Sequence, residues 1–223
     1  MKKVEASLPP TCVRKSDTVM ADSGLARRIA ILLQLARSDD WSKRENGGFG
    51  LRDLMEQEFE PVYEATSVWL DDEDERVRRA VCLACMQRKR WTNKDRLFAL
   101  YERLDNIMID DALYVRKCCG PFVVGYLGYT YPEHSLPWLE QQAVKDTNLN
   151  RLANVAKDFS QALGRQQPRA AVTTLSLLMG DERHRVRSAV LASVRNTAKG
   201  PEGRALLKAE MPQLLDEAMG GKH

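Results

Sequence analysis

The sequence has few of the residues from which common catalytic sites are built. It contains only three histidines, His134, His184 and His223, and they lie so far apart that no histidine-based triad is visible. It also has neither a P-loop nor a glycine motif for dinucleotides. These absences exclude the enzyme classes that such motifs mark. We therefore expect no cofactor and assign no catalytic residue.

Long hydrophobic runs are absent as well. No apolar stretch approaches the roughly 18 residues that a membrane-spanning helix needs. The first twenty residues include Lys2, Lys3, Pro9 and Pro10, and they have no continuous apolar region that could act as a signal peptide. We therefore expect no contact with a membrane, and a cytoplasmic location.

Cysteine is scarce and odd in number, with five residues in the chain, which fits reduced thiols better than a disulfide framework. Cys82 and Cys85 have the spacing of a metal-binding pair, and Cys118 and Cys119 are adjacent. The repeat described next places Cys118 and Cys119 where other units have small apolar residues, which favours a role in the core. A zinc site is the alternative and would need four converging ligands. We predict no metal.

The hydrophobic pattern is helical and it repeats. No stretch alternates with a period of two for long enough to indicate a sheet. Acidic corners instead lead into helices, and one helix position recurs after 34, 38, 36 and 35 residues. The residues at that position are Lys43, Val77, Val115, Arg151 and Val186. This period predicts an all-α fold, a HEAT-like α-solenoid of about five helical hairpins plus a terminal helix.

The boundaries follow from the same pattern. We expect residues 1–20 to form an N-terminal arm and residues 21–223 to form the HEAT-like repeat domain. The pattern predicts one helix from Trp41 to about Phe59, another from Pro61 through Trp69, and the terminal helix from Glu202 to Met219.

Charge is unevenly distributed along the chain although the formal net charge is only +3. From Asp53 to Glu75 there are ten acidic residues and no basic ones, whereas from Arg76 to Arg103 there are nine basic and two acidic residues. A second basic region, Arg183 to Lys208, has seven basic residues against Glu202 alone. Such a separation suits an anionic partner, although solvated helix faces give similar counts.

The corner-and-helix pattern resembles the DNA-alkylation-repair HEAT-like proteins of the AlkD and AlkC type. The stretch from Asp111 to Glu133 carries the resemblance, which extends over most of residues 40–200. The residues concerned are Tyr114, Val115, Arg116, Lys117, Gly120, Pro121, Phe122 and Pro132. The resemblance implies a basic concave surface that holds duplex DNA and, in active members, excision of alkylated purines without flipping the base into a pocket.

The usual glycosylase residues of that family are missing here. Its active members have a glycine followed by tryptophan in the third repeat, with an acid four residues after the tryptophan. In this chain Gly120 is present, but Pro121 stands in place of the tryptophan and Gly125 in place of the acid. The resemblance therefore implies DNA binding without the usual catalytic residues.

Two kinds of basic residue follow the corners. Arg44, Arg78, Arg116 and Arg187 occupy the second helix position, where we expect them to bind the acidic corner of a neighbouring unit. The basic residues without such a role are candidates for phosphate contacts, a solvated helix surface being the alternative. These candidates are Arg79, Arg88, Lys89, Arg90, Lys117, Arg151 and Lys157.

The fourth repeat is unusual because Asn154 and Asp158 lie one turn apart in a row that carries mainly small or apolar residues in other repeats. If that face is closed, the carboxylate needs a partner and its pKa is altered. The pair is either a hydrogen-bonded structural pair or a polar site.

The third-repeat helix is irregular, because Pro121 lies inside it among Gly120, Gly125 and Gly128. Aromatic residues surround this break and are suited either to helix packing or to stacking on an exposed base or a partner's side chain. They are Phe122, Tyr126, Tyr129, Tyr131 and Trp138.

Three functional hypotheses follow. The first is a DNA-binding repeat protein that contacts duplex phosphates. The second is a protein-binding scaffold in which the acidic region Asp53 to Glu75 and the aromatic break meet a partner. The third is a DNA glycosylase for alkylated bases that uses an unconventional acid such as Asp158.

Overall fold

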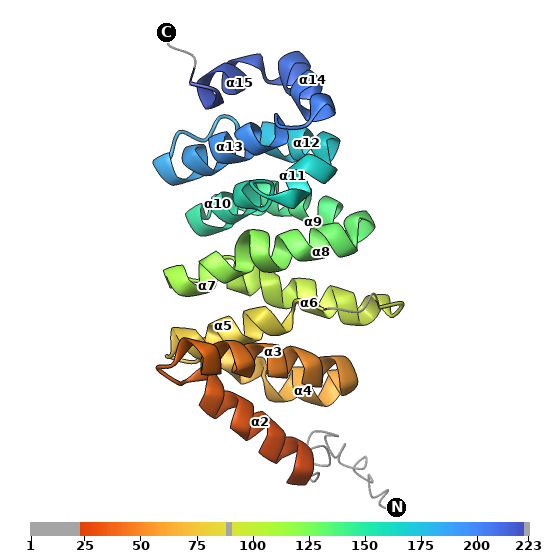
Figure 1. The fold of residues 1–223 in the computed structure, drawn as a ribbon, viewed down its shortest axis with the longest axis vertical. Coiled ribbons are helices and arrows are strands. Elements are labelled where there is room, and N and C mark those ends of the chain that lie inside the picture. Colours follow the sequence, from red (N-terminus) through yellow and green to blue (C-terminus); the bar gives the residue numbers. More distant parts are fainter. Residues whose placement is uncertain (1–22, 88–90, 221–223) are drawn as a thin grey trace, which may run out of the picture.

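The computed structural model describes residues 23–87 and 91–220, and within those ranges the chain forms helices and no strand. Figure 1 shows the helices stacked as a column, with the N-terminal hairpin at one end and the C-terminal hairpin at the other. The predicted all-α solenoid is therefore confirmed. The proposed arm, residues 1–20, lies outside the described residues.

The helices form two rows, and each hairpin contributes to both. In row B, successive helices pack directly on one another through the length of the column. Row B consists of α3 (Trp41–Gln57), α5 (Glu75–Ala84), α7 (Leu113–Cys118) with η2 (Cys119–Val124), α10 (Leu149–Asp158), α13 (His184–Thr197) and α15 (Pro212–Ala218).

Row A holds the helices that precede each corner. It consists of α2 (Ser23–Ala36), α4 (Phe59–Ala65) with η1 (Ser67–Asp71), α6 (Lys94–Ile107), α9 (Pro132–Lys145), α12 (Pro168–Leu178) and α14 (Pro201–Glu210). Two short helices, α8 (Gly125–Thr130) and α11 (Ala162–Gln166), continue the row B helices of the third and fourth hairpins.

Polar corner residues cap the row B helices α3, α5 and α10. Asp40 Oδ1 accepts a hydrogen bond from the backbone N–H of Ser42 at 2.8 Å, and Asp74 Oδ1 accepts one from Arg76 at 2.9 Å. Asn148 does the same for α10. Each cap satisfies a backbone donor that has no partner within the helix.

The corner arginines bind their own corner as well as its neighbours. Arg78 Nη1 donates to the carbonyl of Asp72 at 2.6 Å, while its Nε donates to Asp110 of the next corner at 2.7 Å. Arg44 and Arg116 likewise donate to carbonyls of their own corners. The expected bond to an acidic corner of the neighbouring unit is therefore made by Arg78, whereas Arg44 and Arg116 hold their own corners. Arg187 donates to Glu217 of α15 and to the carbonyl of Met179.

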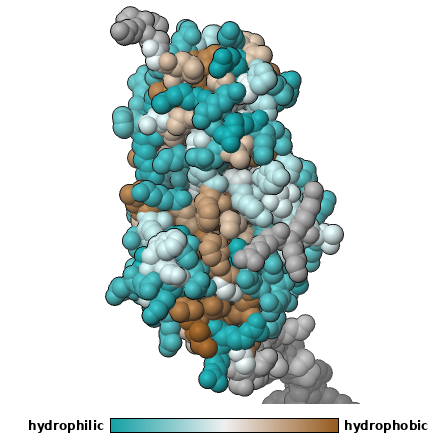
Figure 2. All heavy atoms as spheres, viewed as in Figure 1, coloured by the Kyte–Doolittle hydropathy of each residue, from teal (hydrophilic) through white to brown (hydrophobic). Residues whose placement is uncertain are grey.

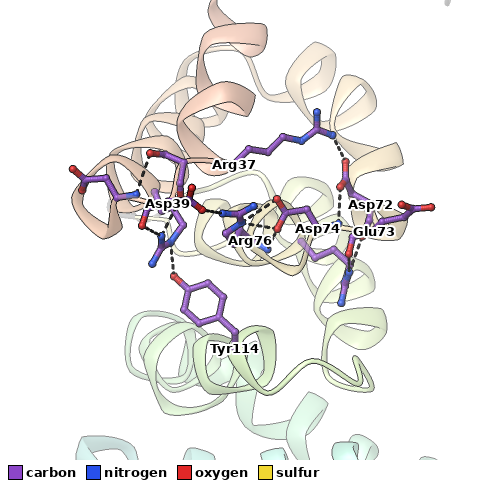
Figure 3. Close-up of polar contacts among 11 residues, drawn as sticks. Arg37, Asp39, Asp72, Glu73, Asp74, Arg76 and Tyr114 are labelled. Atoms are coloured by element: carbon purple, nitrogen blue, oxygen red, sulfur yellow. Dashed lines mark hydrogen bonds and ion pairs between the residues drawn. The ribbon is translucent and has the colours of Figure 1, made fainter.

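Figure 3 shows the polar contacts around the first two corners. Arg76 lies between Asp39 of one corner and Asp74 of the next, with N to O distances of 2.7 and 2.8 Å. Arg37 reaches Asp72 at 2.7 Å, and Tyr114 of the third hairpin accepts a hydrogen bond from Arg44. Many charged side chains near these corners thus form ion pairs within the chain.

Two helix boundaries differ from those expected. The helix that contains Pro61 begins at Phe59 and ends at Ala65, after which the chain continues as a 3-10 helix. The terminal helix is divided into α14 and α15 at Pro212, so the end of the column is a further hairpin. Proline has no N–H for a continuous helix and starts a new one instead.

The thiols of the described cysteines lie in the core. Cys82, Cys85 and Cys119 are fully buried and Cys118 nearly so, and all four are free thiols that form no disulfide with one another. Their expected role as small apolar residues is confirmed. In the two stretches that the structure describes, no three His, Cys, Asp or Glu side chains come together in a way that could hold a metal ion.

Candidate functional site

The third hairpin's row B helix bends in the middle of the column. From α7 it passes into the π-helical segment η2, where Gly120 has a non-helical ψ of −127° and Pro121 follows. Proline removes a backbone donor from the helix and its ring displaces the preceding turn. The irregularity expected at Gly120 and Pro121 is therefore present, and α8 continues beyond it.

The fourth hairpin breaks at a neighbouring level. Helix α10 ends at Asp158, and α11 starts at Ala162 after a short turn. A cavity of about 430 Å³ lies between the two broken helices. Its lining consists of Met86, Pro121, Phe122, Gly125, Tyr126, Tyr129, Asp158, Gln161, Ala162, Leu163 and Gln166.

The walls of this cavity are mainly apolar and aromatic. Phe122 is 47% exposed and Tyr129 is 61% exposed, which is high for side chains of this kind. Figure 2 shows hydrophobic side chains gathered over the middle of the array, at the level of α8. Three of the aromatic residues expected around the break, Phe122, Tyr126 and Tyr129, line the cavity.

The lining also includes Asp158, whose backbone carbonyl oxygen would lie 3.7 Å from a Cβ at Gly125, while both of its carboxyl oxygens are buried. Neither carboxyl oxygen has a hydrogen-bond partner among the described residues. Burial raises the pKa of Asp158 well above its usual range, because a carboxylate without water or a partner is unfavourable. The fold therefore favours the protonated, uncharged form of this side chain.

Asn154 does not form a pair with Asp158. Its Nδ2 donates instead to the carbonyl of Met108 at 3.0 Å. The interpretation of these two residues as a hydrogen-bonded structural pair is thus wrong for Asp158, whereas the expected burial of both is confirmed. Space is left beside them because Gly120 has no side chain; a Cβ there would lie 3.7 Å from Asp158 Oδ1.

Four basic side chains come together on three successive row B helices. Arg116 and Lys117 belong to α7, Lys157 to α10 and Arg185 to α13. Burial lowers the pKa of Lys157, and the charges of Arg185, Lys117 and Arg116 lower it further. Burial and the charge of Arg116 lower the pKa of Arg185 in the same direction. We call these four residues the cation cluster.

The cation cluster has no carboxylate partner within residues 23–87 and 91–220. Arg116 donates to backbone carbonyls of its corner, and Arg185 donates to the side-chain oxygen of Asn150. Lys117 and Lys157 are exposed and make no ion pair in those ranges. Repulsion among four cations is relieved when an anion binds between them.

Two other predicted phosphate contacts require correction. Arg151 is only 3% exposed, and its guanidinium donates to Asp105, Asp146 and Gln142. Arg79 Nη1 lies 2.6 Å from Glu45 Oε1, and its guanidinium stacks over the Tyr114 ring at 4.6 Å. Because both guanidinium groups already bind other side chains of the protein, we exclude them from the candidate surface.

The remaining predicted contacts, Arg88, Lys89 and Arg90, lie outside the described residues. Sequence reasoning missed Arg185 as a phosphate candidate and assigned Arg116 only to its corner. It also missed Met86, Gln161 and Gln166 in the cavity. The repeat period gave one clue to the cation cluster. Lys117 and Lys157 lie two and six positions after the repeat position on consecutive row B helices, and both are exposed.

No protein-family model matches this chain, and no curated protein matches it. Among solved structures it is similar to a designed armadillo repeat protein, YIII(Dq)4CqI, with 17% sequence identity and a TM-score of 0.36. That similarity covers 86% of this chain and 88% of the designed one. The resemblance to the alkylation-repair proteins stays a prediction.

The chain is thus a helical repeat protein with a cation cluster and a mainly apolar and aromatic cavity in the middle of its array. None of the helices in the described part is long and apolar enough to cross a membrane.

Proposed function

We propose that this protein binds the phosphate backbone of duplex DNA through the cation cluster, as a DNA-binding relative of the alkylation-repair HEAT-like proteins. The observation that carries the proposal is the convergence of Arg116, Lys117, Lys157 and Arg185 without a carboxylate among the described residues. Phosphate groups supply the missing negative charge, and each contact releases condensed counterions from the DNA.

The stacking of the solenoid supports an extended ligand. The cation cluster spans α7, α10 and α13, which pack in sequence through η2. A row of cations on consecutive repeats matches a polymer of regularly spaced phosphates better than a single small anion. By this proposal Lys117 and Lys157, which are exposed, make the direct contacts, and the two arginines support them.

The test is the salt dependence of binding to a fluorescein-labelled duplex of about 20 base pairs. We expect the slope of log K against log salt to become shallower by about 1.8 in the double variant Lys117→Ala and Lys157→Ala, since each phosphate contact contributes about 0.9. The matched control is Lys43→Ala with Lys208→Ala, which removes two exposed lysines on other helices. Equal slopes in the two double variants would contradict the proposal.

The protein-scaffold hypothesis makes the opposite prediction for the same assay. It requires the acidic region from Asp53 to Glu75 to be free for a partner, yet Glu58, Glu60 and Asp72 form ion pairs with Arg28, Arg96 and Arg37. Stable capture of a purified protein partner with no duplex binding at low salt would favour it over DNA binding.

A second candidate function, excision of an alkylated base, rests on Asp158, a buried acid whose oxygens have no partner among the described residues and whose pKa is raised by burial. Hydrolysis of the glycosidic bond adds the hydroxyl of water to the sugar carbon, and the base leaves with a proton from Asp158. The second proton of the water then returns to the carboxylate. Release of a modified base from alkylated DNA, lost in Asp158→Asn, is the expected result; absence of release would remove this candidate.

A further inference from the structure

We propose that the cavity between η2, α8 and α11 binds a large apolar side chain from an acidic peptide segment of a partner protein, and that Lys117 and Lys157 bind the carboxylates of that segment. This inference goes beyond the proposed function, because it adds a protein ligand and does not depend on DNA binding. Three observations carry it: the apolar walls of the cavity, the amide groups at its edge, and the cations beside it.

The cavity lies between consecutive row B helices at equivalent positions of the repeat. Phe122 of its lining precedes Asp158 by 36 residues, and Gly125 precedes Gln161 by the same offset, which also separates the repeat positions of these two units. Helices α8 and α11 touch beside it, since a Cβ at Gly128 would lie 2.7 Å from Leu163 Cδ2. The cavity of about 430 Å³ is therefore formed before a ligand binds, and its volume lies within the usual range for ligand sites.

The walls of the cavity suit an apolar side chain. Phe122 and Tyr129 are large side chains that line it and are about half exposed, so a ligand that covers them removes apolar surface from water. The carboxyl oxygens of Asp158 are both buried and not accessible to a ligand there. A nucleobase would lose the hydrogen bonds of its polar edge to water in such a cavity, whereas an aliphatic or aromatic side chain has none to lose.

The edge of the cavity suits a peptide backbone. Gln161 and Gln166 line the cavity from the two ends of α11, and both are exposed. Each amide group offers two donors and an acceptor, which match the C=O and N–H groups of a peptide. An apolar centre with a polar edge is the usual arrangement of a protein interface, in which one anchoring side chain contributes much of the affinity.

The charges beside the cavity select an acidic segment. Lys157 directly precedes Asp158 of the lining, and it occupies on α10 the repeat position that Pro121 of the lining occupies on η2. Lys117 lies about one helical turn before Pro121. Both lysines are exposed and make no ion pair within residues 23–87 and 91–220. Carboxylates that flank the anchoring side chain therefore meet complementary charge, and a basic segment is repelled.

The same charges disfavour the N-terminal residues of this chain as the occupant. Residues 1–20 contain four basic and two acidic side chains, so their net charge has the same sign as that of the lysines. A separate partner with an acidic segment fits better.

The test uses the full chain and a fluorescein-labelled peptide that has one tryptophan between two runs of three glutamates, measured by fluorescence anisotropy without DNA. Control peptides replace the tryptophan by alanine or the glutamates by lysines. Phe122→Ala removes a wall of the cavity, and Ala162→Leu adds bulk to its lining at an exposed position. The matched control is Phe98→Ala, because Phe98 of α6 is 49% exposed and does not line the cavity.

We expect Phe122→Ala and Ala162→Leu each to weaken binding of the glutamate peptide about tenfold, the size of effect that loss of an anchoring contact gives. Replacing the tryptophan of the peptide should have a similar effect, and Phe98→Ala should have none. The double variant Lys117→Ala and Lys157→Ala should weaken binding about fivefold at low salt and less at high salt, because salt screens the attraction. Lys43→Ala with Lys208→Ala is again the control.

Several results would overturn the proposal. They include the absence of binding to the glutamate peptide, equal or tighter binding of the lysine peptide, and an unchanged affinity in both Phe122→Ala and Ala162→Leu. Tighter binding of a synthetic peptide with the sequence of residues 1–20 would assign the cavity to this chain itself. Self-association of the protein that Phe122→Ala abolishes, measured by sedimentation, would assign the cavity to a second copy and would equally overturn it.

Failure of the proposed function is distinguishable from failure of the peptide site, because the peptide assay contains no DNA and the duplex assay contains no peptide. An unchanged salt slope for the duplex in the lysine double variant rejects only DNA binding. Unchanged peptide affinity in the two cavity variants rejects only the peptide site. Thermal melting establishes that each variant is folded, and the agreement of one variant that opens the cavity with one that fills it guards against a local defect in either.

Discussion

The two ends of α10 make an instructive comparison. Arg151 near its start and Asp158 at its end are both buried polar residues in rows that carry mainly apolar or small residues elsewhere. Arg151 donates to three different side chains, from α9, from α6 and from the corner at Asp146. Neither carboxyl oxygen of Asp158 has a partner among the described residues, although both are buried.

The difference separates structural from functional burial. A buried charge whose hydrogen bonds are all made holds its neighbours together and has nothing left for a ligand. A buried carboxyl group without partners destabilises the fold unless something else uses it. The same helix therefore carries a structural residue at one end and the candidate site at the other.

The largest expected effect on stability comes from removing the paired side chain of Arg151. Arg151→Ala should lower the free energy of unfolding by about 3–5 kcal/mol, because it leaves the partners of a buried ion pair uncompensated. Urea denaturation measures the change. Arg183→Ala is the control, since Arg183 is 42% exposed in its pair with Asp181 and its loss should change stability far less. Similar values for the two variants would mean that Arg151 is not a structural residue.

The opposite sign is expected at the unpaired end. Asp158→Leu should raise the free energy of unfolding by about 1–3 kcal/mol, because it removes an unsatisfied buried polar group. The control is Asp110→Leu, whose carboxylate accepts from Arg78 and which should destabilise the protein. Destabilisation by Asp158→Leu as well would indicate that Asp158 has a partner.

The pH dependence of stability sharpens the same comparison. The pKa of Asp158 is raised in the folded protein. The contribution of this group to the free energy of unfolding is therefore fully present below about pH 3.9, the unfolded-state pKa, and is lost as pH rises toward the folded-state pKa. From about pH 4 upward, Asp158→Asn should gain on the wild type by up to about 1.4 kcal/mol per pH unit. Denaturation at several pH values measures this difference. A constant difference between the two proteins would refute a raised pKa.

The smallest effect is expected at the cation cluster. Lys157→Met should raise stability by about a few tenths of a kcal/mol, and more so at low salt, because it relieves repulsion from three neighbouring cations. Lys208→Met, at an exposed lysine of α14, serves as the control. Thermal melting at two salt concentrations would detect the change. A salt-independent loss of stability would argue that Lys157 has an unnoticed favourable contact.

The fold was predictable because one physical pattern repeats. Val77, Val115 and Val186 recur at one position and are all fully buried, and Asp74 of the corner before Val77 caps its helix. The same register held the information about Arg151, which occupies the valine position and was nonetheless assigned to the surface. Because Arg151 is an arginine, it was assigned to the surface. Its repeat position, which valine occupies in other units, correctly predicts a buried side chain.

The candidate site was predictable only in part. The register placed Asp158 in a closed row, and the glycines and Pro121 indicated a break in the helix. How far two broken helices separate, and whether a partner reaches the carboxyl group between them, depends on packing across repeats that periodicity does not encode. For the same reason Arg185, two repeats away from Lys117, could not be assigned to the cation cluster from its sequence position.

The most direct test of the central claim is a pH titration of the Asp158 carboxyl carbon by NMR, with Asp158→Asn to assign the signal. The account predicts that this carboxyl group stays protonated well above its ordinary pKa of about 3.9 in the free protein. An ordinary titration with a midpoint near pH 4 would contradict it, because Asp158 would then be solvated or paired rather than buried without a partner.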